Sequence, residues 1–211
     1  MKRRAFALST VTAALAPLWL PATAQAADEG YITLKTPVPT DVPAGKVRVI
    51  EFFSYGCIHC MHFAPILSAW EKDKAPAEGA DLRLVHVGFS KAFEPLQKIF
   101  YALEAIGQRD KVHEKLFTAL QVDKIRLDQP DVLFPWMAKN GVDRTKFEAA
   151  YNSFGVATQV RRANELQEAY QVEGTPALGI AGKYYTDGSM ARGFDRMLQI
   201  TDTLVAKERK A

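Results

Sequence analysis

Two cysteines separated by two residues are the side chains in this sequence most able to do chemistry. They are Cys57 and Cys60, the only cysteines of the chain. Apolar residues recur at helical spacing after them, so Cys57 is expected at the start of a helix, where unpaired N–H groups and the helix dipole favour a thiolate. His59, when protonated, adds a cation that lowers the thiol pKa further. A stabilised reduced form predicts an oxidising disulfide.

Other uses of the cysteine pair are a structural disulfide and a metal site. A disulfide that closes so short a loop removes little chain entropy and would stabilise the fold only slightly. Zinc could recruit His59, His62 or His86, but no second Cys or His pair at ligand spacing occurs elsewhere. Haem attachment requires a histidine where Met61 stands. Redox chemistry is therefore the favoured interpretation.

An acidic residue lies in an apolar, β-branched segment shortly before the cysteines. This residue, Glu51, would have a raised pKa if it were buried, because burial penalises the charged form. It could then accept a proton from Cys60, the thiol that we expect to be buried, or return it. The alternative is an exposed strand position paired with Lys46 or Arg48. The place of the acid in the motif favours the functional interpretation.

The N-terminus has the three parts of a secretory signal. Residues 1–26 begin with three basic residues, continue with an uncharged apolar stretch and end in small residues, which predicts cleavage after Ala26. Pro17 and Pro21 argue against a membrane anchor. Two adjacent arginines also fit the twin-arginine route, but the general secretory route is favoured. We expect export to the periplasm, an oxidising compartment in which a disulfide can persist.

The composition is ordinary for a globular protein, with 48% hydrophobic and 24% charged residues in 211. It excludes a disordered, collagen-like or disulfide-stapled chain, and the length predicts one domain with an insertion. Three of the 27 basic residues lie within residues 1–26, which contain no acid, so the remainder has 24 basic and 24 acidic residues. A neutral mature chain gives no electrostatic reason to bind nucleic acid, and no such partner is predicted.

The elements that must position the cysteines follow from hydrophobic spacing. Residues 47–53 and 82–87 have strand patterns, and the helix between them contains Pro65, so the two strands are expected to pair in parallel. Further strands are predicted at 31–34, 177–180 and 183–185. Apolar residues recur at helical spacing from 93 to 162, which predicts several helices there, one of them at 145–154. Two further helices are predicted at 162–170 and 192–207.

Taken in order, these motifs resemble the exported DsbA-type thiol:disulfide oxidoreductases of the thioredoxin superfamily. The resemblance rests on the segment from Glu51 to Cys60, the helical insertion, Tyr151-Asn152-Ser153-Phe154, Gly174-Thr175-Pro176-Ala177 and Gly182-Lys183-Tyr184. Two positions depart from the pattern. Ile58 replaces the usual proline between the cysteines, and Ala64 stands where a charged residue is often found.

The resemblance implies an α/β thioredoxin fold, a central mixed sheet flanked by helices, with an inserted helical domain. Residues 27–90 and 162–211 would form the two parts of this fold, and 91–161 the insertion. An X-Pro bond alone is expected to be trans. The resemblance instead implies a cis bond between Thr175 and Pro176 beside the disulfide, with the Thr175 backbone pairing to an extended client segment.

The implied activity is that of a protein disulfide oxidase whose only redox group is the Cys57–Cys60 disulfide, with no separate cofactor. Its partners would be reduced, unfolded or folding client proteins and a DsbB-type quinone-linked membrane protein that reoxidises it. The lead-in before the first core strand is too short for the dimerisation domain of DsbC-type isomerases, so a monomer is expected. The alternatives are an isomerase or reductase of the same fold, or a non-catalytic client-binding chaperone module.

Overall fold

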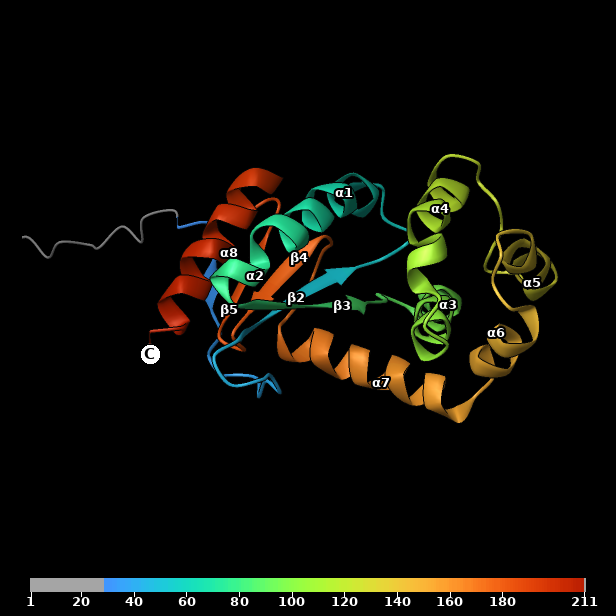
Figure 1. The fold of residues 1–211 in the computed structure, drawn as a ribbon, viewed down its shortest axis with the longest axis horizontal. Coiled ribbons are helices and arrows are strands. Elements are labelled where there is room, and N and C mark those ends of the chain that lie inside the picture. Colours follow the sequence, from blue (N-terminus) through green and yellow to red (C-terminus); the bar gives the residue numbers. More distant parts are fainter. Residues whose placement is uncertain (1–28, 211) are drawn as a thin grey trace, which may run out of the picture.

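A five-stranded mixed sheet forms the centre of the protein in a computed structural model that describes residues 29–210 (Figure 1). The predicted signal, residues 1–26, lies outside the described residues. The strand order is β1-β5-β4-β2-β3, with β2 and β3 parallel and the other pairs antiparallel. The strands are β1 (Ile32–Thr33), β2 (Val47–Phe53), β3 (Ala80–His86), β4 (Ala177–Ile180) and β5 (Tyr184–Asp187). The predicted parallel pairing and mixed sheet are confirmed.

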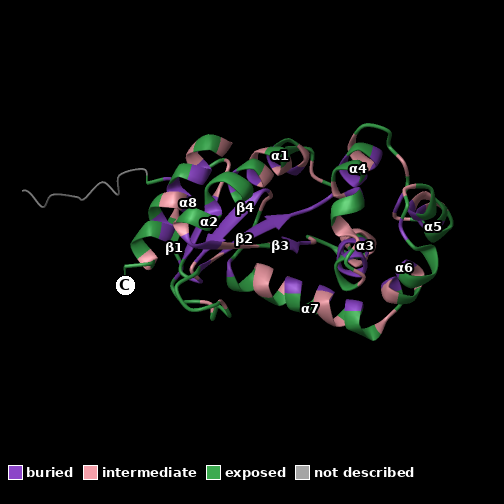
Figure 2. Cartoon of the chain, in the orientation of Figure 1, coloured by how far each residue is buried: buried purple, intermediate pink, exposed green. Residues whose placement is uncertain are grey.

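Strand β2 is the central element that leads to the cysteines. Its β-branched and aromatic residues suit a strand covered on both faces, and all but Arg48 are buried. Figure 2 shows this burial along β2 and β4. The register places Glu51 opposite Leu84 of β3 and opposite Leu178 of β4. An acidic side chain therefore stands in the middle of an apolar sheet.

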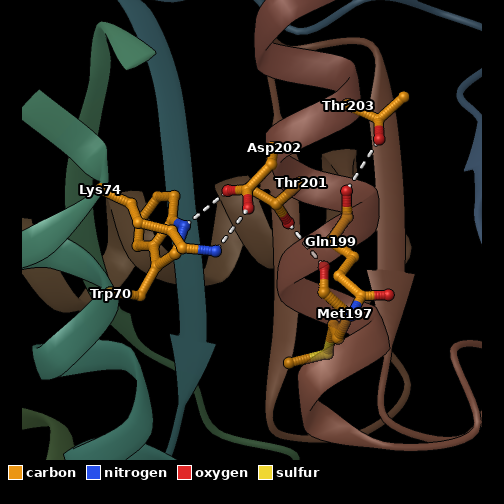
Figure 3. A network of polar contacts seen from close by, with 7 residues as sticks. All are labelled: Trp70, Lys74, Met197, Gln199, Thr201, Asp202 and Thr203. Carbon is orange, nitrogen blue, oxygen red and sulfur yellow. Dashed lines mark hydrogen bonds and ion pairs between the residues drawn. The ribbon is translucent and has the colours of Figure 1, made fainter. Parts of the chain in front are cut away.

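Three helices, α1 (Ile58–Asp73), α2 (Ala75–Glu78) and α8 (Phe194–Glu208), lie on one side of the sheet (Figure 1). Trp70 of α1 donates from its indole N–H to the Asp202 carboxylate of α8 at 2.6 Å, and the Lys74 ammonium lies 3.6 Å from the same carboxylate (Figure 3). These contacts fix α1 against α8. Helix α8 begins at Phe194 and not at residue 192, where the sequence pattern placed its start. Arg192 and Gly193 have φ angles of 60° and 140°, which an α-helix excludes.

A helical insertion separates β3 from β4 and extends beyond the end of β2 at which the cysteines lie (Figure 1). Its elements are a 3₁₀ turn (Lys91–Phe93), α3 (Glu94–Ala105), α4 (Arg109–Gln121), α5 (Pro130–Lys139), α6 (Arg144–Tyr151) and α7 (Phe154–Ala169). The expected helix end at 154 and restart at 162 are wrong. Ser153 caps α7 by accepting from the Val156 N–H at 3.1 Å, so the helix starts there and continues unbroken to Ala169.

Helix α7 covers the face of the sheet opposite α1 and α8 (Figure 1). Tyr170, directly after the helix, is fully buried, and its ring packs against the backbone of Gly179 in β4. Among residues 29–210, no helix has the length and apolar character needed to cross a bilayer.

Candidate active site

Helix α1 presents the first cysteine and buries the second. Cys57 is the N-cap of the helix, with extended backbone angles, and its side chain is half-buried. Its N–H donates to the Ser54 carbonyl at 3.0 Å, which closes the turn between β2 and α1. Cys60 lies one turn later and is completely buried. Both cysteines are free thiols, so the structure describes the reduced form.

The environment of Cys57 favours the thiolate, and its pKa is lowered to about 5. The largest cause is a hydrogen bond from the Cys60 thiol, and the Thr175 side chain and the backbone N–H groups of Cys60 and His59 add to it. The predicted position at a helix start and the predicted direction of the shift are confirmed. The backbone N–H of His59 is a further contact that the sequence argument did not include.

Cys60 has the opposite environment, because burial raises its pKa strongly and the neighbouring Cys57 and Glu51 raise it further. A group that resists ionisation is a poor leaving group until a proton reaches it. The two sulfurs of the motif are therefore chemically unequal. Cys57 is half-buried and readily ionised, whereas Cys60 is completely buried and readily protonated.

The loop before β4 lies directly beside Cys57. The Thr175–Pro176 bond is cis, as the family resemblance implied. The Cys57 thiol donates to the Thr175 carbonyl oxygen at 3.3 Å, across 118 residues of sequence. A pocket of about 360 Å³ adjoins this contact and has His59, Thr175, Pro176 and Phe194 among its lining residues. Ile58, between the two cysteines, has an exposed side chain that is 41% accessible.

Glu51 is buried behind the cysteines, with 3% of its surface accessible. Its pKa is raised to about 8, chiefly by burial and in smaller part by the charges of Cys57 and Glu71. A pocket of about 490 Å³ between α1 and α4 reaches Glu51 and is also lined by Glu71 and Arg109. The alternative of an exposed acid paired with Lys46 or Arg48 is therefore wrong. Arg48 instead pairs with Asp81.

Replacing Glu51 by glutamine is expected to stabilise the protein at alkaline pH. The folded pKa of about 8 exceeds the ordinary value of 4.5. The folded state therefore holds this proton more tightly, and the stability that the proton provides is complete below about pH 4.5 and is lost as the pH rises through about 8. Glutamine has nearly the same shape as glutamate, but its side chain does not ionise. The whole shift corresponds to about 5 kcal/mol, but the disulfide form lacks the Cys57 charge that contributes to it and keeps only the effect of burial. For that form we expect the variant to gain on the order of 2 kcal/mol over the parent at pH 9, and much less at pH 5.

Denaturant unfolding of the disulfide form across this pH range measures the difference, because neither thiol titrates there. Glu114→Gln is the matched control, since Glu114 lines the same pocket, is exposed and is not among the groups that shift the pKa of Glu51. A Glu51→Gln gain that is equal at both pH values would contradict the raised pKa.

The structure also bears on the metal interpretation. Within residues 29–210, no group of three or more His, Cys, Asp or Glu side chains is arranged to hold a metal ion. His86, one of the suggested ligands, is buried and occupied: its Nε2 accepts from the Tyr55 N–H at 3.0 Å, and its Nδ1 contacts the Val87 carbonyl at 3.0 Å.

Sequence reasoning missed the side chains around Tyr55. The Tyr55 hydroxyl lies 2.9 Å from Nδ1 of His113, and the Tyr55 carbonyl accepts from the Gln121 amide at 2.8 Å. Both partners belong to α4, more than fifty residues further along the chain. They have no motif spacing, so only the folded arrangement identifies them.

The fold and the site define a class: a thioredoxin-fold protein with a dithiol at the start of its first long helix and a helical insertion. Residues 48–205 match the family model of the DSBA-like thioredoxin domain. The chain is 37% identical over 204 residues to the thiol:disulfide interchange protein DsbA of Bordetella parapertussis, with 96% of each chain covered. It is also 37% identical over 206 residues to that of Azotobacter vinelandii, covering 98% of this chain and 92% of the relative.

Solved structures agree with this assignment. The crystal structure of Pseudomonas aeruginosa DsbA matches with a TM-score of 0.81 at 35% identity, covering 86% of this chain and 93% of that one. The oxidoreductase NmDsbA1 of Neisseria meningitidis matches with a TM-score of 0.72 at 32% identity, covering 86% and 94%. The chain therefore belongs to the DsbA-like thioredoxin-domain family. It is a thiol:disulfide oxidoreductase that carries its redox pair, Cys57 and Cys60, at the start of α1.

Proposed function

We propose that this protein works as a disulfide donor, with Cys57 as the sulfur that client proteins attack. The observation that carries the proposal is the inequality of the two thiols: Cys57 is accessible with a lowered pKa, whereas Cys60 is buried with a raised one. Stabilisation of the Cys57 thiolate favours the reduced form and makes the disulfide oxidising. Exposure of the same sulfur gives client thiolates a path to it.

The reaction begins when a client thiolate attacks Cys57 Sγ in the disulfide form. A mixed disulfide forms between client and Cys57, and the Cys57–Cys60 bond breaks with its electron pair on Cys60. Glu51, protonated at neutral pH because of its raised pKa, is the proton source that we assign to the buried Cys60 thiolate. The pocket that reaches Glu51 gives it a route for proton exchange with solvent.

In the second half of the reaction, Cys57 is released as a thiolate. A second client thiolate attacks the client sulfur of the mixed disulfide, which creates the client disulfide and releases Cys57. Two electrons have passed from client to protein, and the low pKa of Cys57 makes it a good leaving group. His59 acts through its backbone N–H at the thiolate.

The loop at Thr175 and Pro176 is the client-binding element that we propose. Its contact with Cys57 brings an extended client segment, paired with the Thr175 backbone, within reach of the reacting sulfur. The adjoining pocket, lined mainly by apolar surface around Phe194, can receive a client side chain. Such backbone pairing suits many client sequences, because main-chain groups are common to all of them.

Export, partners and domain division complete the proposal. The signal pattern of residues 1–26 supports export to the periplasm, and a DsbB-type quinone-linked membrane protein would reoxidise the dithiol. The protein would act as a monomer. Residues 27–90 and 162–211 would form the thioredoxin part and 91–161 the insertion, although α7 passes without interruption through the second boundary.

The ultraviolet absorbance of the Cys57 thiolate against pH tests the proposal, with Cys57→Ser as the blank. We expect a midpoint near 5, the value to which the surroundings lower the pKa. Equilibration in glutathione buffers then separates the oxidase from an isomerase or reductase of the same fold, because a reducing potential excludes a donor of disulfides. A midpoint as high as that of free cysteine would overturn the proposal.

A further inference from the structure

The turn that leads into α1 is held by side chains from outside its own segment. Tyr55 is completely buried and has a partner for each of its polar groups. Its N–H donates to His86 at 3.0 Å, and its carbonyl accepts from Gln121 at 2.8 Å. Its hydroxyl lies 2.9 Å from His113 Nδ1. Strand β3 thus holds the turn from one side, and α4 of the insertion holds it from the other.

The protonation states of these groups are mutually compatible near neutral pH. Burial lowers the pKa of His113 to about 4 and that of His86 to about 3, and it raises the pKa of Tyr55. A protonated tyrosine hydroxyl and a neutral His113 ring form a complementary hydrogen-bonding pair, because each has both a donor and an acceptor. His86 donates from Nδ1 to the Val87 carbonyl, which leaves its Nε2 free to accept from the Tyr55 N–H.

Tyr55 is coupled to the reactive sulfur through a very short stretch of backbone. The Gly56 N–H donates to the Ser54 hydroxyl at 3.1 Å, and the Cys57 N–H donates to the Ser54 carbonyl at 3.0 Å. A shift of Tyr55 would therefore move the first residue of α1. The Cys57 thiolate is stabilised chiefly by the Cys60 thiol and also by the backbone N–H groups of Cys60 and His59, which all belong to that first turn. A hydrogen bond weakens steeply with distance and angle.

We propose that Gln121 and His113 are positioning residues for Cys57: by holding Tyr55, they keep the start of α1 in the geometry that stabilises the thiolate. The helical insertion thus contributes to the oxidising power of a site that it does not itself contain. Neither residue touches the sulfur, and both act through the turn. This inference rests on the proposed function, since it concerns the same thiolate.

The test compares Gln121→Met with the parent protein. Methionine keeps the length and volume of the side chain but leaves the Tyr55 carbonyl without its donor. We expect the midpoint of the Cys57 thiolate absorbance to rise by about half a unit or more, which is about threefold in the ionisation constant of the thiol. The equilibrium constant for oxidising glutathione should fall by a similar factor, because it follows the stability of the reduced form.

Leu120→Ala is the matched control for loss of stability. Leu120 neighbours Gln121 and packs against the core of the insertion. Its truncation should lower the denaturant midpoint of unfolding and leave the thiolate midpoint unchanged. Tyr55→Phe keeps the ring and removes only the hydrogen bond to His113, so it provides a second, milder variant that is expected to shift the thiolate midpoint in the same direction.

The outcomes separate the two levels of inference. A parent midpoint like that of free cysteine would remove the proposed function itself. A low parent midpoint that Gln121→Met and Tyr55→Phe both leave unchanged would overturn the positioning role alone. Equal shifts in Gln121→Met and Leu120→Ala would also overturn it, because general loosening of α4 would then suffice.

Discussion

Cys57→Ser is expected to lower the rate at which the protein oxidises a reduced client by at least about a thousandfold. Serine cannot form the mixed disulfide. The remaining thiol, Cys60, is completely buried and its pKa is raised, so it cannot replace the lost sulfur. Oxidative refolding of a reduced client, followed by its regain of activity, measures the loss. The fold should persist, because Cys57 is the N-cap of α1 and serine is a favoured N-cap residue.

Cys60→Ser is the informative partner variant. It also lacks the internal disulfide and cannot turn over as an oxidase, but it keeps the accessible thiolate of Cys57. Incubated with a disulfide-bonded client, it should accumulate a mixed disulfide that non-reducing electrophoresis detects, whereas Cys57→Ser should accumulate none. Capture by Cys57→Ser equal to that by Cys60→Ser would show that the attacking sulfur has been assigned wrongly.

Gly182→Ala is expected to lower the free energy of unfolding by about 3–4 kcal/mol, the largest effect we expect away from the cysteines. Gly182 turns the chain between β4 and β5 with a φ of +70°, and an added Cβ would overlap the Val38 carbonyl oxygen far inside van der Waals contact. The Gly182 carbonyl accepts a hydrogen bond from the Val38 N–H at 2.7 Å. Relieving the overlap therefore means breaking that hydrogen bond.

Gly45→Ala separates the two contributions to this loss. Gly45 has a similar φ of +77°, but a Cβ there would meet nothing within 4 Å. The substitution Gly45→Ala should lower the free energy of unfolding only by the cost of a left-handed backbone at alanine, about 1 kcal/mol. Guanidinium unfolding of both variants gives the comparison. Equal losses would mean that the lead-in segment moves away freely and that the overlap costs nothing.

Local pattern was sufficient for most of the fold. The strand at 47–53 was predicted with its observed bounds, because a β-branched and aromatic run leaves few alternatives. The strand at 177–180 was also predicted with its observed bounds, from a short apolar run that follows a proline. The start of α7 was missed, because its signal is the single capping residue Ser153 rather than a periodic pattern. The start of α8 was placed two residues too early, because Arg192 adopts a positive φ without a sequence signal.

The sequence by itself determined the chemistry of this protein: a dithiol at the start of a helix, preceded by an acid in an apolar strand. Residue type and short-range spacing suffice for that, since helix geometry follows from neighbours along the chain. The family resemblance added that Thr175 lies beside the cysteines. Only the tertiary structure decided that Glu51 is buried rather than exposed, and that Gln121 and His113 hold the turn before Cys57. Burial and contacts between distant segments depend on how the whole chain packs, so no local pattern records them.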